Sequence, residues 1–472
     1  MGDCCKAGDY YSWCDDHDEL HVDVSSGHYC IFHAPAEEKG VTLVEFNNLI
    51  FERINKAKID EKLCKLSGTI YPGRIEFLQY NKSNPLPGID FSGSTFSGQV
   101  FFAETVFSNS ANFNDVIFSD YADFVKVCFS AEALFFAATF SGGVSFSSTF
   151  FSKGADFLAA RFDDIAIFSK ATFVKETLFL ACVFSKIARF DSAIFEDKVS
   201  FSKAVFESAL YFGRSNSEKS VFFGGEVRFD DVEFCGLTQF SYLNVSSSTW
   251  LCFLGARFTG STEFSNISMP SRVLFARVNV TKDAVLRFTH VFFVGGISFE
   301  EAIIDGKLIM KSGKPEHNKA WLFEWSSFKV PQISDYNSEN LLFGDEVDFT
   351  SMSITGIMRL EGALLNNVRF LHSDINHIDF VRCKFPKPQF IIRWYARWRL
   401  KKEELLLDEL ECCNIEESNV LQLEKKLDKT IDVEALYIGL KQRAVTDHDW
   451  HDASVWNFNE KDMTLQKNRL AS

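Results

Sequence analysis

Cysteine and histidine residues gather near the N-terminus, at spacings that suit metal binding. Residues 1–40 contain four cysteines and four of the chain's ten histidines, which are Cys4, Cys5, Cys14, Cys30, His17, His21, His28 and His33. Cys30 and His33 form a C-x-x-H pair, and Cys5 and Cys14 form a C-x8-C pair. Thiolate and imidazole groups in two short-range pairs joined by a loop suit a tetrahedral Zn²⁺ site. The sequence therefore predicts one zinc ion, with Cys4 as the rival of Cys5. The expected ligands are Cys5, Cys14, Cys30 and His33.

A closed site of this kind would be structural, because three thiolates and one imidazole leave no position for water. A segment of about 35 residues has too little core to fold unaided, so the metal would supply the folding energy. Two other interpretations stay open. Residues 1–40 contain nine acids and two bases, which fits a disordered acidic leader with incidental Cys and His. The third interpretation is a redox or catalytic thiol.

A second run of reactive side chains lies near the C-terminus. Residues 447–452 read Asp-His-Asp-Trp-His-Asp, which at first suggests metal binding or acid–base catalysis. The plainer interpretation is a turn in which Asp449 caps the following helix. Since no catalytic constellation can be read from the sequence, we expect a protein that is not an enzyme. Catalysis by His448 and His451 with nearby acids is the alternative.

Between these two candidate sites, phenylalanine recurs in alternating steps of five and six residues. The series runs without a miss through Phe96, Phe102, Phe107, Phe113, Phe118, Phe124, Phe129, Phe135, Phe140, Phe146, Phe151, Phe157, Phe162, Phe168, Phe173, Phe179, Phe184, Phe190, Phe195, Phe201, Phe206 and Phe212. The true repeat is therefore eleven residues, and a fixed period indicates a repeat architecture. A helix needs apolar residues three and four apart, so the spacing argues against helix.

Small residues precede most of these phenylalanines by two positions, as in Ala122-Asp123-Phe124 and Ala193-Ile194-Phe195. Residues two apart in a strand point to the same face, so each unit offers a small residue and a Phe to one interior. The residues between are Ser, Asp, Gly, Lys and Glu, which suit bends and water. A unit this short cannot fold back as a hairpin, but it can form one side of a stacked coil. The pattern therefore predicts an all-β solenoid with ladders of Phe inside.

These A-x-F units resemble the pentapeptide-repeat family, in a Phe-rich branch that alternates five and six residues. The resemblance covers roughly residues 70–387 and implies a right-handed quadrilateral β-helix with 22 residues per coil. Tyr29-Cys30-Ile31-Phe32-His33 is similar to the end of a small cysteine–histidine module that precedes some Phe-rich members. The resemblance also implies a bacterial protein and, over Tyr437, Leu440, Lys441, Asp449, Ala453 and Glu460, a helical hairpin. In many members this hairpin leads into membrane helices, whereas this sequence ends at Ser472.

Breaks in the repeat predict the domain organisation. Six segments follow: 1–40, the zinc-binding Cys/His module; 41–69, a capping helix and linker with apolar spacing over 42–58; 70–310, the β-helix; 311–341, an insertion leaving one corner; 342–387, the final coils; and 388–472, a helical cap. A smaller insertion is expected around 214–220. Arginine and lysine alternate with Trp and Tyr over 393–402, which favours a cap on the last coil, with a membrane-surface helix as the alternative.

Charge and cysteine usage limit the function classes. The net charge is −15, and residues 88–216 have 14 acids and 10 bases, which is weak support for a DNA mimic acting on a topoisomerase. An acidic chain is also a poor nucleic-acid binder, since phosphate contacts need a basic stripe. Twelve scattered cysteines and the lack of a basic-then-apolar leader favour a reducing cytoplasm. We expect a non-enzymatic scaffold with an unidentified protein partner, and peripheral membrane contact through the C-terminal segment as the alternative location. The sequence does not indicate the oligomeric state.

Overall fold

The structure, a computed structural model, shows two compact units, Met1–Trp250 and Leu251–Ser472. It describes residues 13, 21–24, 27–213, 220–293, 295–311, 347–354, 357–361, 363, 365, 368–373, 375–381, 383–385, 406, 408–409, 412, 415, 420–446 and 450–471. Several predictions from the sequence fall outside these residues. They concern Cys4, Cys5, Cys14, residues 214–219 and 312–346, the basic aromatic stretch 393–402, His448, Asp449 and the side chain of His451.

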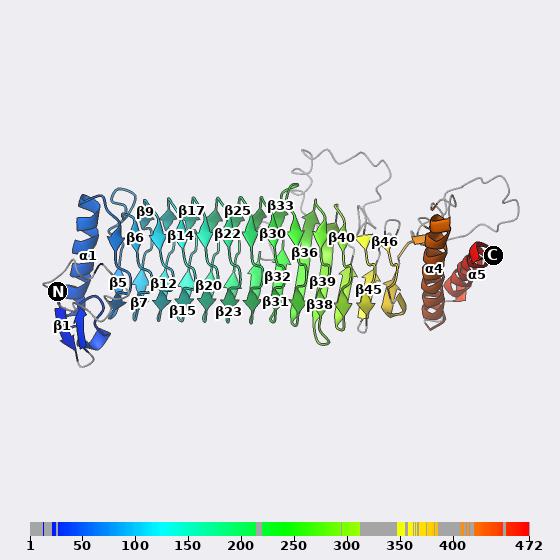
Figure 1. The fold of residues 1–472 in the computed structure, drawn as a ribbon, viewed down its shortest axis with the longest axis horizontal. Coiled ribbons are helices and arrows are strands. Elements are labelled where there is room, and N and C mark those ends of the chain that lie inside the picture. The colour runs from blue at the N-terminus through cyan, green and yellow to red at the C-terminus, as the bar shows by residue number, and fades with distance from the viewer. Residues whose placement is uncertain are drawn as a thin grey trace. The chain divides into compact units, whose positions relative to one another are not determined.

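The N-terminal unit is a parallel β-solenoid whose strands form four faces (Figure 1). Face 1 contains β3 (Cys64–Lys65), β6 (Ile89–Asp90), β10 (Ala111–Asn112), β14 (Ala133–Leu134), β18 (Ala155–Asp156), β22 (Thr177–Leu178), β26 (Val199–Ser200) and β30 (Val227–Arg228). Face 2 contains β4 (Ile70–Tyr71), β7 (Thr95–Phe96), β11 (Ile117–Phe118), β15 (Thr139–Phe140), β19 (Arg161–Phe162), β23 (Val183–Phe184), β27 (Val205–Phe206) and β31 (Glu233–Phe234). Face 3 contains β5 (Ile75–Glu76), β8 (Val100–Phe101), β12 (Ala122–Asp123), β16 (Val144–Ser145), β20 (Ala166–Ile167), β24 (Ala188–Arg189), β28 (Leu210–Phe212) and β32 (Thr238–Ser241). Face 4 contains β9 (Val106–Phe107), β13 (Cys128–Phe129), β17 (Phe150–Phe151), β21 (Thr172–Phe173), β25 (Ile194–Phe195), β29 (Phe222–Phe223) and β33 (Asn244–Val245).

Neighbouring strands are one coil apart in the chain, and the register keeps like residues stacked. Ala111 pairs with Ala133, which pairs with Ala155, so the repeat is 22 residues. The phenylalanines predicted to face inward are buried, and rings one coil apart stack almost parallel. Phe135, for example, lies 4.9 Å from Phe157 with 4° between the ring planes. Most of these rings have a buried alanine or valine two positions earlier in the chain, which confirms the two-residue pattern read from the sequence.

Each five-residue step that joins faces 1 and 2, or faces 3 and 4, turns at a residue with positive φ. Ala137 and Ala159, at φ 52° and 58°, are two members of a series that recurs every eleven residues from Glu104 to Lys203. In one such turn the Ala160 amide donates to the Phe157 carbonyl at 2.9 Å, three residues back, with Ala159 at the third position. This is the geometry of a type II turn, which needs a left-handed residue there. The five-residue steps are therefore those in which such a turn joins two faces.

The start of the solenoid is covered by α1 (Leu43–Ile59) and by the hairpin of β1 (His21–Val24) and β2 (Gly27–Cys30). Thr42 and Glu45 form a capping box at the start of α1. Phe46, Ile50 and Ile54, spaced three or four apart, are its buried residues. A 3-10 turn, η2 (Ala36–Glu38), precedes the helix.

Side chains of α1 also bond to carbonyls that the first coil leaves at its open edge. Arg53 donates to the Lys65 carbonyl at 2.7 Å, and Asn47 donates to the Arg74 carbonyl at 3.0 Å. Unpaired backbone groups at a sheet edge invite other strands, so this cover protects the edge.

The C-terminal unit continues the same design with three sheets. The first contains β34 (Leu251–Cys252), β37 (Val273–Leu274), β40 (Ile297–Ser298), β43 (Val347–Asp348) and β46 (Val368–Arg369). The second contains β35 (Arg257–Phe258), β38 (Asn279–Val280), β41 (Ile303–Ile304) and β44 (Ser353–Ile354). The third contains β36 (Ser261–Met269), β39 (Val285–Phe293), β42 (Lys307–Lys311), β45 (Ile357–Glu361) and β47 (Ile378–Val381). In the third sheet, β42 ends at Lys311. The next described residue is Val347 of the first sheet, where β43 pairs with β40.

Two helices close the C-terminal unit, α4 (Val420–Thr446) and α5 (Trp450–Ala471), which pack on one another. α4 also packs on a short 3-10 turn, η5 (Ile375–His377), which lies between β46 and β47. Its buried residues include Val433, Leu436, Tyr437 and Leu440, the amphipathic pattern read from the sequence. Phe385 lies 4.8 Å from Trp456 of α5 and joins the helices to the end of the β-structure.

Each unit is thus a parallel β-solenoid, and the C-terminal unit ends in helices, so the predicted fold class is confirmed. Among the described residues, no helix is both long enough and apolar enough to cross a membrane. No disulfide joins two of the cysteines that the structure describes.

Candidate functional site

Cys30 and His33, the C-x-x-H pair, are brought together by a tight turn at the end of β2. The Cys30 carbonyl accepts hydrogen bonds from the amides of His33 and Ala34, both at 3.0 Å. This closure places the two side chains on the same side of the turn. Cys30 Sγ lies 3.0 Å from His33 Nδ1, and both residues are buried.

The second ring nitrogen of His33 fixes which tautomer faces the sulfur. His33 Nε2 lies 3.0 Å from the carbonyl oxygen of Ser67, in the first coil. A carbonyl oxygen only accepts, so Nε2 has the proton and the lone pair of neutral His33 is on Nδ1, facing Cys30. Metal-bound histidines are held in this way, with the other nitrogen donating to a carbonyl or carboxylate.

Trp13 closes one side of the pair. Its indole Nε1 donates to both the carbonyl and the hydroxyl of Ser67, at 3.1 and 2.9 Å, and its ring lies 5.0 Å from the His33 ring. The guanidinium of Arg53 lies over the Trp13 ring, 4.3 Å from the ring centre. Two residues from the module thus meet at one residue of the first coil, Ser67.

A buried lysine donates hydrogen bonds to carbonyls of the turn that follows β2. Lys39 is 2% exposed, and its Nζ donates to the carbonyls of Ile31 and Phe32 at 2.6 and 3.1 Å and lies 4.5 Å from the Phe46 ring centre. Burial lowers the pKa of Lys39 from its ordinary 10.5 to about 7, although the Cys30 sulfur acts in the opposite direction and raises it. The ammonium is therefore placed where a negative charge on Cys30 would offset the cost of its burial.

The nearby thiol of Cys64 contrasts with Cys30. Burial raises the pKa of Cys64 to about 12, opposed by the charge of Arg53. Cys64, in the next strand after β2, is therefore a protonated core thiol at neutral pH. A thiolate, not a thiol, is the metal ligand.

The donor set fits part of the predicted zinc site. The structure brings Cys30 and His33 together, while Cys5 and Cys14, like the rival Cys4, lie outside the described residues. Among the described residues no group of three or more His, Cys, Asp or Glu side chains is arranged to hold a metal ion. A complete site therefore requires ligands from outside the described part of the chain. The lone pair of Nδ1 and the sulfur of Cys30 would be its two ligands from the β2 turn.

Several residues of this site could not be found from the sequence. Ser67 lies 34 positions after His33 and contributes a main-chain carbonyl, which leaves no mark on its side-chain type. Lys39 has no periodic or motif signal. Trp13 had one weak signal, its position next to Cys14.

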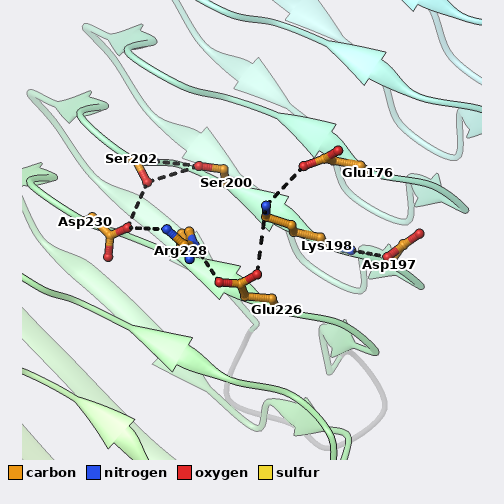
Figure 2. Close-up of polar contacts among 8 residues, drawn as sticks. All are labelled: Glu176, Asp197, Lys198, Ser200, Ser202, Glu226, Arg228 and Asp230. Carbon is orange, nitrogen blue, oxygen red and sulfur yellow. Dashed lines mark hydrogen bonds and ion pairs between the residues drawn. The ribbon is translucent and has the colours of Figure 1, made fainter.

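A second polar cluster lies on face 1, where the strands β22, β26 and β30 run side by side. Figure 2 shows Lys198 reaching from one coil to Glu176 and Glu226 of the coils on either side, at 3.4 and 3.9 Å. Arg228 contacts Glu226 at 2.5 Å and Asp230 at 3.6 Å. Two bases pair with three acids here, and the ion pairs of Lys198 cross-link consecutive coils.

The predicted motif near the C-terminus is only partly described. α5 begins at Trp450, directly after Asp449, which is the position expected for a cap. His448, Asp449 and the side chain of His451 lie outside the described residues, so the catalytic alternative is untested. Lys441 of α4 pairs with Glu460 of α5, two positions of the expected helical hairpin.

The fold defines the class of this protein, a repeat protein built as a parallel β-solenoid. No protein-family model, curated protein or solved structure matches the chain.

Proposed function

We propose that this chain is a non-enzymatic scaffold of the pentapeptide-repeat type, which holds a protein partner on its rigid solenoid. The support is the continuous ladder of buried rings, which makes each coil depend on its neighbours and leaves the outward side chains free to vary. We place it in the bacterial cytoplasm, as the resemblance and the twelve scattered cysteines favour.

Its N-terminal module would be folded by one structural zinc ion held by Cys5, Cys14, Cys30 and His33. The observation that supports this most is the pair of Cys30 and His33, with Nδ1 of the histidine aimed at the sulfur and Nε2 tied to Ser67. Trp13, the residue before Cys14, packs against the same histidine. The metal would supply folding energy to a hairpin too small to fold alone.

Metal content tests the zinc proposal. Protein purified without added metal is expected to contain about one zinc per chain, and Cys30→Ser to contain almost none. Cys64→Ser is the matched control, since Cys64 is an equally buried cysteine with no histidine beside it in the described structure and is expected to keep the metal. Zinc retained by Cys30→Ser, or absent from the parent protein, would refute the site.

The scaffold proposal is tested by partner capture with the full-length, zinc-loaded protein. A specific protein should be recovered that also binds the purified chain at micromolar concentration. Failure to find such a partner in the native cell counts against a scaffold role.

Two alternatives rest on the family resemblance. For mimicry of DNA, acidic groups should stand unpaired over the surface, whereas Lys198 and Arg228 form ion pairs with the acids of the cluster on face 1. Unchanged supercoiling by a topoisomerase at saturating protein would exclude it. Membrane association would use the basic aromatic stretch 393–402, and sedimentation with anionic vesicles measures it directly.

A further inference from the structure

Face 1 of the N-terminal unit has apolar side chains on its outer surface over three consecutive coils. These residues, called the apolar patch below, are Leu134, Phe136, Leu158, Leu178 and Leu180. They alternate with inward residues that are fully buried, such as Ala133 and Phe135, so they point away from the core. Phe136 is 39% exposed, and the leucines are half-buried.

The patch is contiguous because the register stacks its members. Leu134 and Leu178 are the outer residues of β14 and β22 and flank Asp156 of β18. The second row runs through Phe136, Leu158 and Leu180, since the amides of Ala137 and Ala159 donate to the Leu158 and Leu180 carbonyls. A contiguous apolar area on a solvent face marks an interaction surface more often than scattered residues do.

Polar residues at the same positions end the patch on both sides. The preceding coil has Asn112 and Asn114 in these two rows, and the following coil has Ser200 and Ser202, two residues of the cluster in Figure 2. The apolar side chains are therefore a local departure from the outer pattern of this face.

The charge of the face limits what can cover the patch. Face 1 over residues 110–115, 132–137, 154–159 and 176–181 has four acids, Asp115, Glu132, Asp156 and Glu176, and no base. Lys153 and Lys175 come just before two of these segments, at the corner that leads into the face. Stacking the patch of a second copy on this one would therefore bring acids against acids. A partner with its own basic groups suits the face better.

The dimensions favour a helix. Coils are spaced by about 4.8 Å, close to the ~5.4 Å pitch of an α-helix, so one apolar residue per turn can meet one coil across three coils. A helix is about 10–12 Å wide with its side chains, comparable to the two outer rows of one face.

From these observations we propose that the apolar patch binds a basic amphipathic helix of the partner protein, lying along the solenoid axis. Its apolar stripe would contact the leucines, and its lysines or arginines would pair with Glu132, Asp156 and Glu176. Glu176 already pairs with Lys198 at 3.4 Å, but an exposed ion pair is weak enough to exchange partners. This inference rests on the proposed scaffold function and names the surface that performs it.

A labelled synthetic helix tests the proposal by fluorescence anisotropy with the full-length protein. The probe is a peptide of about four turns with leucine on one face and lysine on the other. It should bind the parent protein, and binding should weaken as salt is raised, because the acids are screened. The same peptide with glutamate in place of lysine should bind at least about tenfold more weakly.

Two sets of variants separate this surface from the rest of the solenoid. Leu158→Ser combined with Leu180→Ser should weaken binding of the lysine peptide about tenfold or more, and Glu132→Gln should reduce its salt dependence. Ile117→Ser, at an exposed apolar residue on face 2, should change nothing. Circular dichroism and thermal unfolding confirm that each variant folds.

Three results would overturn the proposal: equal binding by the leucine variants, equal binding of the glutamate peptide, or absence of binding by folded protein. Dimerisation that the leucine variants abolish would assign the patch to a second copy instead. None of these bears on the zinc content of the same samples or on the recovery of a partner. Failure here therefore leaves the scaffold and zinc proposals to their own tests.

Discussion

His33 and Ser67 are joined by a hydrogen bond between the imidazole Nε2 and the main-chain carbonyl, 3.0 Å long, across 34 residues of sequence. The bond ties the N-terminal module to the first coil and, at the same time, aims Nδ1 of the ring at Cys30. One contact therefore both positions a metal ligand and covers an edge of the solenoid. The module and the coil should stabilise one another, which leads to the first prediction.

The stability of the N-terminal module should rise between pH 7 and pH 9. Burial lowers the pKa of Lys39 to about 7 from 10.5, so above pH 7 the unfolded chain holds a proton that the folded module has released. A difference of one proton changes the free energy of unfolding by about 1.4 kcal/mol per pH unit. Cys64, whose pKa burial raises from 9.0 to about 12, cancels this rise above pH 9, because the folded thiol keeps a proton that the unfolded thiol has lost. Denaturant midpoints followed by Trp13 fluorescence should rise in the parent and stay flatter in Lys39→Met, and equal slopes would contradict the prediction.

Adjacent phenylalanines of β17 should differ sharply when each is truncated. Phe151 is fully buried and stacks between Phe129 and Phe173, at 5.1 and 4.7 Å, so Phe151→Ala should cost about 3–5 kcal/mol. Phe150 is 41% exposed, and Phe150→Ala should cost far less, about 0.5 kcal/mol. Guanidinium unfolding followed by circular dichroism measures both, and similar losses would show that the ladder is not the main source of stability.

Glycine should have opposite effects at two neighbouring alanines. Ala159 has φ 58°, a conformation that costs an L-residue roughly 1–2 kcal/mol, whereas Ala160 is a buried residue without positive φ. Both substitutions loosen the unfolded chain equally, so their difference combines the strain relieved at Ala159 with the loss of the buried methyl group of Ala160. Ala159→Gly should therefore be more stable than Ala160→Gly by at least about 1–2 kcal/mol. Equal unfolding midpoints would refute the assigned turn geometry.

A side chain at position 439 should loosen the C-terminal cap. Gly439 of α4 faces η5, where a Cβ would lie 3.3 Å from Asn376 Oδ1. Gly439→Leu should push the helix away, at a cost of about 1–3 kcal/mol, and increase hydrogen exchange at the amides of β47. Leu421→Ala is the control, because Leu421 of the same helix is 75% exposed and should leave exchange unchanged. Unchanged exchange in Gly439→Leu would mean that α4 does not cover the last coil.

Much of the fold was predictable because its signal is local and repeated. The step between phenylalanines and the small residue two places earlier determine which side chains face inward, and Ala122 and Phe124 lie as expected. The helical pattern around Leu436 and Tyr437 was equally readable, since periodicity needs no knowledge of the partner element. The positive φ at Ala159 was not predicted, because alanine has no special preference for it.

The sequence predicted only those residues of the candidate site that lie close together in the chain. Cys30 and His33 are three residues apart, so one turn joins them. Ser67 and Lys39 were missed because their roles depend on the fold and on main-chain atoms. The remaining expected ligands, Cys5 and Cys14, stay predictions.

The cover on the first coil has a consequence for how the protein stays dispersed. Ile70 donates its amide to the Phe32 carbonyl at 2.8 Å, two residues from Cys30, so the module's own backbone occupies the place of a further strand. If zinc folds the module, removal of the metal exposes a flat parallel edge, and such an edge recruits others like it. Chelation should then convert a monodisperse sample into end-to-end aggregates that scatter light, which the added metal reverses. By keeping the module folded over the first coil, the bound ion would prevent solenoids from associating end to end.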